Sequence, residues 1–188
     1  MQPSTQQPPE SELPDNNNNN TKSSQESNTD FIIYTDGSSH TDKIGGFGAI
    51  VVSTKYPQAA YIPVAGACTN IGTDRAEFMA VLSGLWSIVD TMGWDRTKYI
   101  LTLKEEQPSI LVYTDREDLA GSINGVFRRH RNQDLWNQFI WFESHFNIKA
   151  KHVKRETVSV QSSADKIASE MRIVLKEFIN VQTELNHI

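Results

Sequence analysis

Two short apolar runs, each followed directly by an aspartate, place the strongest constraint on the fold of this chain. Residues 31–35 precede Asp36, and residues 110–114 precede Asp115. Both runs are rich in β-branched and aromatic residues, which predicts two buried strands that each end at an acid. Because a buried carboxylate is costly without a compensating cation, the pattern favours a site for a hard cation such as Mg²⁺ or Mn²⁺.

Two further acids lie in helical patterns, and we expect each in the first turn of its helix. Glu77 stands in DRAEFMAVLSGL and Asp165 stands in SSADKIASEM. Each of the four acids has a simpler interpretation when it is taken alone. Asp36 would form a turn and Asp115 would cap a helix, while the two helical acids would interact with a helix dipole. Four carboxylates that meet in one place are what two divalent cations need.

The rest of the pattern predicts a mixed sheet flanked by helices. Strands are expected at 31–35, 45–53, 61–67, 110–114 and 148–153, and helices from 73 or 74, at 118–127, at 134–146 and from about 163. The first three strands follow one another, whereas the later strands alternate with helices. The order βββαβααβα therefore predicts an α/β fold with a five-stranded mixed sheet and helices on both faces.

The 188 residues divide into a polar leader and one domain. Residues 1–30 contain two adjacent prolines, five consecutive asparagines and almost nothing apolar, which predicts a disordered tail, either a solvated leader or a tethering segment. Residues 31–188 form the predicted domain, with an insertion at about 90–109 and a helical extension at about 173–188. The tail carries a net charge of −4 of the total of −5, so the domain is nearly neutral.

Composition excludes several classes of protein. A single cysteine, Cys68, leaves no internal disulfide and no cysteine-rich zinc site. The sequence has neither an apolar run long enough to span a bilayer nor the apolar core of a signal peptide. We therefore expect a cytoplasmic, intracellular protein that does not bind a membrane.

The C-terminal helical pattern carries a heptad-like apolar stripe. Its members alternate by four and three positions: Ile167, Met171, Val174, Phe178, Val181 and Leu185. Such a stripe packs against another apolar surface. Either it covers the sheet or the insertion, or it forms an interface with a second copy of the chain or another protein.

Over roughly residues 31–172 the chain resembles the type 1 ribonuclease H family, within the ribonuclease H-like superfamily. The resemblance rests on YTDGSS, GGFGAIVVS, TDRAEFMAVLSGL, LVYTDREDL, INGVFRRHRNQDLWNQF, and HVK followed by ADKIA, in family order. It implies a metal-dependent endonuclease that hydrolyses the RNA strand of an RNA·DNA hybrid with two Mg²⁺ or Mn²⁺ ions. It further implies that Asp36, Glu77, Asp115 and Asp165 are catalytic metal ligands, and that Asp36 bridges both ions.

The resemblance also suggests where substrate binds. The candidate contacts are Gly37, Ser38, Thr73, Asp74, Arg75, Arg128, Arg129, Arg131 and Lys154. Basic residues among them would contact phosphates, although a solvated charged surface is the simpler interpretation. Thr73 and Asp74 replace the usual asparagine, and a carboxylate beside a phosphate would weaken that contact.

One departure from the family pattern affects catalysis. The family commonly places a histidine that assists proton handling in the loop after strand five, whereas Glu156 occupies that position here. Loss of a proton-transfer group costs roughly 10² to 10⁴ in rate, so slow turnover is expected. Two alternatives to a hybrid-specific ribonuclease stay open. One is a DNA-directed nuclease of the same fold, and the other is a non-catalytic or weakly active protein for nucleic-acid binding or assembly.

Overall fold

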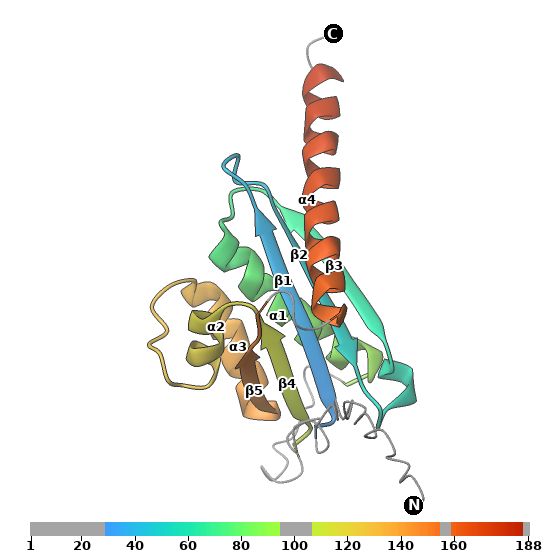
Figure 1. Ribbon diagram of the computed structural model, residues 1–188, viewed down its shortest axis with the longest axis vertical. Helices are drawn as coiled ribbons and strands as arrows, with labels where there is room; N and C mark the ends of the chain where they lie inside the picture. Colours follow the sequence, from blue (N-terminus) through green and yellow to red (C-terminus); the bar gives the residue numbers. More distant parts are fainter. Residues whose placement is uncertain (1–28, 95–106, 155–158, 186–188) are drawn as a thin grey trace, which may run out of the picture.

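A five-stranded sheet forms the centre of the computed structural model, which describes residues 29–94, 107–154 and 159–185 (Figure 1). The strands are β1 (Phe31–Ser39), β2 (Gly45–Val52), β3 (Ile62–Cys68), β4 (Ser109–Thr114) and β5 (Asn147–His152). They lie in the order β3-β2-β1-β4-β5. The pairs among β1, β2 and β3 are antiparallel, and β4 is parallel to both β1 and β5. The predicted mixed sheet is confirmed.

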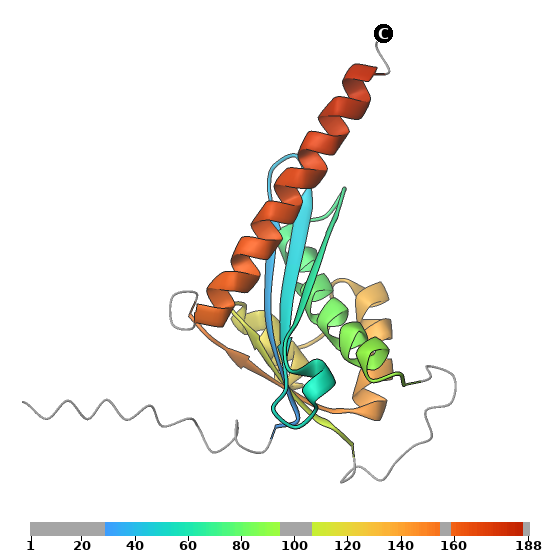
Figure 2. The ribbon, with the colours of Figure 1, turned by 90° about the vertical axis from the view of Figure 1, so that its right-hand side faces the viewer.

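Helices cover both faces of this sheet, as predicted. They are α1 (Thr73–Thr91), α2 (Glu117–Ile123), α3 (Gln133–His145) and α4 (Ser159–Leu185), and a short 3₁₀ helix, η1 (Pro57–Ala59), precedes β3. Figure 2 shows α4 on one side of the sheet, with α1 and α3 on the other side. The main apolar core lies on the α1 side, where fully buried Phe31, Phe139 and Phe142 pack together with residues of α1, α2 and β4.

The position of Asp36 corrects one expectation. Strand β1 continues through Ser39, so Asp36 lies within the strand and does not end it. The cause is the hairpin, because Asp36 pairs with Gly48 and the following residues pair with the rest of the glycine-rich start of β2. Strand β4 does end directly before Asp115. Glu77 and Asp165 lie in the second turns of α1 and α4, not in the first turns.

Helix α4 packs closely on the sheet because β2 presents glycines to it. A Cβ atom added to Gly46 would lie 2.0 Å from the carbonyl oxygen of Ala168, and one added to Gly48 would lie 2.6 Å from that of Ala164. The expectation that this helix covers the sheet is therefore confirmed. Farther along, α4 extends past the sheet (Figure 1), and the apolar residues there are 46% to 59% exposed: Ile173, Val174, Phe178, Val181 and Leu185. An interface formed by that exposed part stays a prediction.

We expect Gly46→Ala to lower the free energy of unfolding by about 1 to 3 kcal/mol, because the new methyl group would meet the backbone of α4. Urea denaturation measures this loss. Gly66→Ala in β3 is the matched control, since the atoms nearest to its methyl group would belong to the half-buried side chain of Phe47 and not to the backbone of α4. An equal loss for both variants would contradict close contact between α4 and β2.

The ends of the described segments refine the predicted boundaries. Asp30, which we assigned to the tail, accepts hydrogen bonds from the backbone amide (2.8 Å) and hydroxyl (2.9 Å) of Ser109 and so belongs to the domain. Helix α1 runs to Thr91, so the insertion begins later than expected. The rest of the tail and the apolar run at 99–103 lie outside the described residues. No helix in the described segments is both long and apolar enough to cross a bilayer.

Candidate active site

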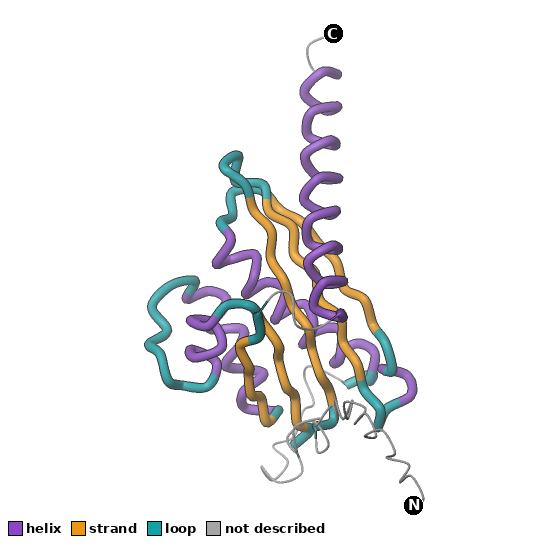
Figure 3. Tube along the Cα trace, viewed as in Figure 1, coloured by secondary structure: helices purple, strands orange, loops and turns teal. Residues whose placement is uncertain are grey.

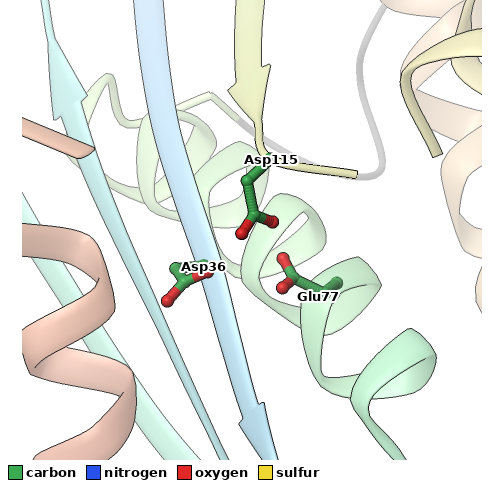
Figure 4. Close-up of side chains that lie close together, drawn as sticks. All are labelled: Asp36, Glu77 and Asp115. Carbon is green, nitrogen blue, oxygen red and sulfur yellow. The ribbon is translucent and has the colours of Figure 1, made fainter. Parts of the chain in front are cut away.

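Three of the four predicted acids meet in one place (Figure 4). Asp36 comes from β1, Glu77 from α1, and Asp115 directly follows β4. One carboxylate oxygen from each lies within 4.8 Å of those of the other two. Asp36 and Glu77 are buried, and Asp115 is half-buried. The structure therefore joins acids that are separated by 41 and 38 positions in the sequence.

The sheet positions the two aspartates. Strands β1 and β4 pair in parallel with Tyr34 opposite Tyr113. Asp36, within β1, and Asp115, directly after β4, each follow this pair by two residues, so they lie at the same level on neighbouring strands. The hydroxyl of Thr35 donates a hydrogen bond to the carbonyl of Tyr113 at 3.1 Å, which ties the strands together just before the acids. Side chains at the same level of adjacent parallel strands lie close together because neighbouring strands are only about 4.8 Å apart.

A glycine lets α1 bring Glu77 to the aspartates. A Cβ atom added to Gly37 would lie 2.3 Å from the backbone nitrogen of Glu77, so only a residue without a side chain permits this approach. The backbone of Gly37 also hydrogen-bonds to the Glu77 carboxylate. Gly37 therefore serves the packing of α1 against β1, and its predicted contact with substrate stays a prediction.

The electrostatics of the three acids favour a bound cation. Burial, followed by the charges of Asp36 and Asp115, raises the pKa of Glu77 well above its ordinary value, while the Gly37 backbone and the charge of Arg116 oppose that rise. The buried Oε2 atom of Glu77 has no hydrogen-bond partner among the described residues. A buried carboxylate oxygen of this kind is stabilised when it coordinates a metal ion, and three oxygen donors suit Mg²⁺ or Mn²⁺.

The fourth acid, Asp165, is not a member of this close group. It lies half-buried in the second turn of α4. Its neighbour Ala164 packs over Gly48, which is the register partner of Asp36. Asp165 is thus adjacent to the residue that covers this part of β1 and β2, and its role as a ligand stays a prediction.

Gln161 is a residue of this region that the sequence pattern did not single out. Its side chain is fully buried, and its Nε2 atom donates a hydrogen bond to the carbonyl of Thr35 at 2.5 Å. Its Oε1 atom is buried without a hydrogen-bond partner among the described residues. Gln161 therefore anchors the start of α4 beside Asp36. Its position four residues before Asp165, one helical turn away, is the signal that could have indicated it.

Known proteins are similar to this chain in sequence. No family model matches the chain. A Ribonuclease H of Campylobacter jejuni strain 81-176 and a Ribonuclease HI of C. jejuni strain NCTC 11168 are each 28% identical over 123 residues, which cover 65% of this chain and 76% of the relative. In sequence the chain is thus similar to ribonucleases of the type 1 ribonuclease H family.

Solved structures of ribonuclease H domains have the same fold as this chain. The N-terminal RNase H domain of Rv2228c from Mycobacterium tuberculosis superposes with a TM-score of 0.62 at 18% identity, covering 79% of this chain and 97% of that one. LC11-RNase H1, in a complex with an RNA/DNA hybrid, gives a TM-score of 0.58 at 17% identity, and the superposition covers 74% of this chain and 94% of that one. RNase H1 from Halobacterium salinarum gives a TM-score of 0.54 at 18% identity, and the superposition covers 75% of this chain and 96% of that one.

In this ribonuclease H-like domain, the candidate substrate contacts before Glu77 are engaged within the protein. The hydroxyl of Thr73 lies 2.8 Å from that of Ser39. Arg75 forms a bidentate pair with Asp134 at 2.9 and 2.5 Å. Ser38, another candidate, accepts a hydrogen bond from Arg172 at 3.2 Å. These side chains hold β1, α1, α3 and α4 together.

Asp74, the carboxylate that we expected to weaken a contact to a phosphate, is also paired within the protein. Arg116 donates to its Oδ1 atom at 2.6 Å, and Arg131 donates to its Oδ2 atom at 3.0 Å. The hydrogen bond from Arg116 is the main cause that lowers the pKa of Asp74. The carboxylate is therefore largely neutralised, and the weakening of a phosphate contact that we expected from it does not follow.

The loop between α2 and α3, residues 124–132, carries the arginine cluster (Figure 3). Arg129 turns inward: it donates to the Ser122 carbonyl, forms a bidentate pair with Glu143, and lies 4.3 Å from the ring centre of Trp136. It holds the loop against α3, and its predicted contact with substrate stays a prediction. Arg128 is exposed and makes no ion pair with any described residue.

A small cavity of about 70 Å³ lies between this loop and Glu77, and its lining also includes Arg116, Arg128 and Arg131. On the other side, the exposed His152 ends β5 opposite Thr114 and lines a depression together with Asp115. Lys154 is exposed close by, whereas Glu156, which we expected in place of the loop histidine, lies outside the described residues.

Proposed function

We propose that this chain is a metal-dependent endoribonuclease that hydrolyses the RNA strand of RNA·DNA hybrids. The observation that carries the proposal is the convergence of Asp36, Glu77 and Asp115 within 4.8 Å on a ribonuclease H fold. The relatives named Ribonuclease H and the related structure with an RNA/DNA hybrid support the choice of substrate.

The three acids, together with Asp165, would hold two Mg²⁺ or Mn²⁺ ions. When bound, the cations would acidify the attacking water and neutralise charge on the leaving 3′ oxygen. The chain's own contribution is to hold the carboxylates rigidly, through the β1–β4 pairing and the close contact of Gly37 with Glu77. No side chain needs to act as a nucleophile, because water attacks the phosphodiester.

Basic residues around the acids would bind the hybrid. Arg128, Arg131 and Lys154 are exposed and lie on segments that flank the site. Contacts from such residues to phosphates release condensed counterions, so the affinity for the hybrid would fall as salt rises.

Replacing Arg128 tests these contacts. We expect Arg128→Gln to raise KM for the hybrid roughly two- to tenfold, with kcat unchanged. The slope of log KM against log salt concentration should fall by about one. Steady-state cleavage between low and moderate salt measures both quantities. Lys166→Gln, which removes an exposed cation on α4, is the control that should leave both parameters unchanged. Equal effects in the two variants would mean that Arg128 acts only through net charge.

A parallel digest tests the proposal itself. Labelled RNA·DNA hybrid, duplex RNA, duplex DNA and each single strand are incubated with the purified chain in Mg²⁺, in Mn²⁺ or in EDTA. We expect cleavage of the RNA strand of the hybrid alone, and only with a cation present. Cleavage of duplex DNA would favour the DNA-directed alternative.

The non-catalytic alternative makes a different prediction about metal. A chain that binds or assembles without hydrolysis would leave every substrate intact and would not be stabilised by Mg²⁺ or Mn²⁺. The exposed apolar part of α4 is the observation that keeps this alternative open. A thermal unfolding series with increasing Mn²⁺ separates the two functions without requiring turnover.

A further inference from the structure

Arg116 occupies a special position, because it directly follows the acid Asp115 and is also the residue before α2. Its guanidinium forms a bidentate pair with Asp118, at 2.9 Å from Nε and 2.7 Å from Nη2. Its remaining nitrogen, Nη1, donates to Asp74 at 2.6 Å. One side chain thus joins three segments: the end of β4, the first turn of α2 and the first turn of α1.

Through Asp74, Arg116 is also connected to α1, the helix that carries Glu77. Asp74 precedes Glu77 by three residues, so both lie on the same side of α1, one turn apart. Arg116 therefore links the backbone beside Asp115 to the helix turn beside Glu77. Arg131 holds the second oxygen of Asp74 at 3.0 Å, which fixes the orientation of that carboxylate.

This link opposes a specific force. Three carboxylates within 4.8 Å of one another repel when they are ionised, and that repulsion would push α1 away from β4. A charge-assisted, bidentate arginine pair is strong and directional, and the Arg116 side chain is only 27% exposed, so solvent weakens the pair less than at an open surface. All three nitrogens of the guanidinium have partners within the protein, which leaves a phosphate little to bind.

We propose that Arg116 is a positioning residue that holds Glu77 and Asp115 at metal-binding separation through Asp74 and Asp118. This inference rests on the proposed metal-dependent function. Asp74 is then the partner through which Arg116 acts on the helix turn that carries Glu77.

The sign of the effect on metal affinity distinguishes positioning from simple electrostatics. Removal of a positive charge near three carboxylates should tighten cation binding if only Coulomb attraction matters. Loss of a positioning contact should instead weaken it, by about tenfold for a residue that supports metal ligands. Isothermal titration calorimetry with Mn²⁺ on Arg116→Gln therefore gives opposite results for the two roles.

Two more variants complete the test. Arg116→Lys keeps the charge but loses the bidentate geometry, and we expect it to weaken Mn²⁺ binding as well, by a smaller factor. Asp74→Asn combined with Arg116→Gln should bind Mn²⁺ no more weakly than Arg116→Gln alone, because the two residues act as one unit. Asp134→Asn is the matched control: it breaks the Arg75–Asp134 pair between α1 and α3 and should leave Mn²⁺ affinity unchanged. Thermal unfolding in EDTA checks that each variant is folded.

The outcomes separate this inference from the proposed function. Weaker Mn²⁺ binding by both folded Arg116 variants, with the control unchanged, supports positioning. Unchanged or tighter binding in Arg116→Gln overturns the inference while the proposed function stands. A rise in KM for the hybrid at unaltered Mn²⁺ affinity also overturns it, because Arg116 would then be a substrate contact. Failure of the unsubstituted chain to bind Mn²⁺ would overturn the proposed function, and the inference with it.

Discussion

Asp36→Asn is expected to lower the rate of hybrid cleavage in Mg²⁺ by about 10³-fold or more. Asp36 is fully buried within β1, and it is a member of the acid group proposed to hold the ions. The substitution keeps the size of the side chain and removes its charge, so the metal affinity falls while the strand pairing with Gly48 remains. Single-turnover cleavage of a labelled hybrid measures the loss, and Mn²⁺ titration calorimetry shows whether metal binding accounts for it.

The control for this experiment is an aspartate near the same hairpin that lies outside the acid group. Asp42→Asn removes an exposed carboxylate from the turn between β1 and β2, where it pairs with Lys176. We expect its cleavage rate to stay within about twofold of the unsubstituted chain, since surface ion pairs contribute little. Equal rates for Asp36→Asn and the unsubstituted chain would exclude hydrolysis at this site.

The strand patterns predicted the fold and most of the acid group because their signals are local. The runs before Asp36 and Asp115 are apolar on both faces, and they are buried in the centre of the sheet. The true end of β1 was missed because the Asp-Gly-Ser sequence is typical of a turn. Pairing with the glycine-rich start of β2 overrides that local preference and extends the strand to Ser39.

Side-chain partners that are distant in sequence could not be predicted. Arg116 and Asp74 are 42 positions apart, and the pattern of charges identifies neither as the partner of the other. The inward turn of Arg129 toward Glu143 is likewise a product of the loop conformation. A cluster of arginines therefore indicated a binding surface, although one of its members stabilises the loop.

Buried polar residues are a second limit on prediction from pattern. Gln161 is fully buried, yet nothing apolar marks its position. Its burial is tolerated because its amide donates to the carbonyl of Thr35, a contact across 126 positions. This contact holds the Ser159 end of α4, which the apolar pattern did not indicate, against β1.

Glu77→Gln should stabilise the metal-free protein at neutral and alkaline pH. Burial and the neighbouring acids raise the pKa of Glu77 well above its ordinary value of 4.5. Between 4.5 and the raised value, the folded state binds more protons than the unfolded state, so the free energy of unfolding contributed by Glu77 falls as pH rises. Above the raised value the full penalty of a buried, ionised carboxylate remains. Glutamine has the same shape without that charge, so it removes the penalty.

Thermal unfolding in EDTA from pH 4 to pH 8.5, with both proteins at each pH, measures the effect. We expect Tm of Glu77→Gln to exceed that of the unsubstituted chain at high pH by about 2 to 4 °C for each kcal/mol of penalty removed, and the difference to vanish below the ordinary pKa. Asp74 and Asp134, whose pKa values are lowered by Arg116 and Arg75, give the opposite pH trend in both proteins and cancel in the difference.

Addition of Mn²⁺ should reverse the order of stability, because the cation stabilises the ionised Glu77 that the glutamine variant lacks. Equal Tm values in EDTA across the whole pH range would mean that Glu77 is not destabilised by burial among like charges. A variant that gained as much stability from Mn²⁺ as the unsubstituted chain would show that Glu77 is not a ligand. The same residue thus lowers stability without metal and raises it with metal, which is the expected behaviour of a carboxylate placed for cation binding.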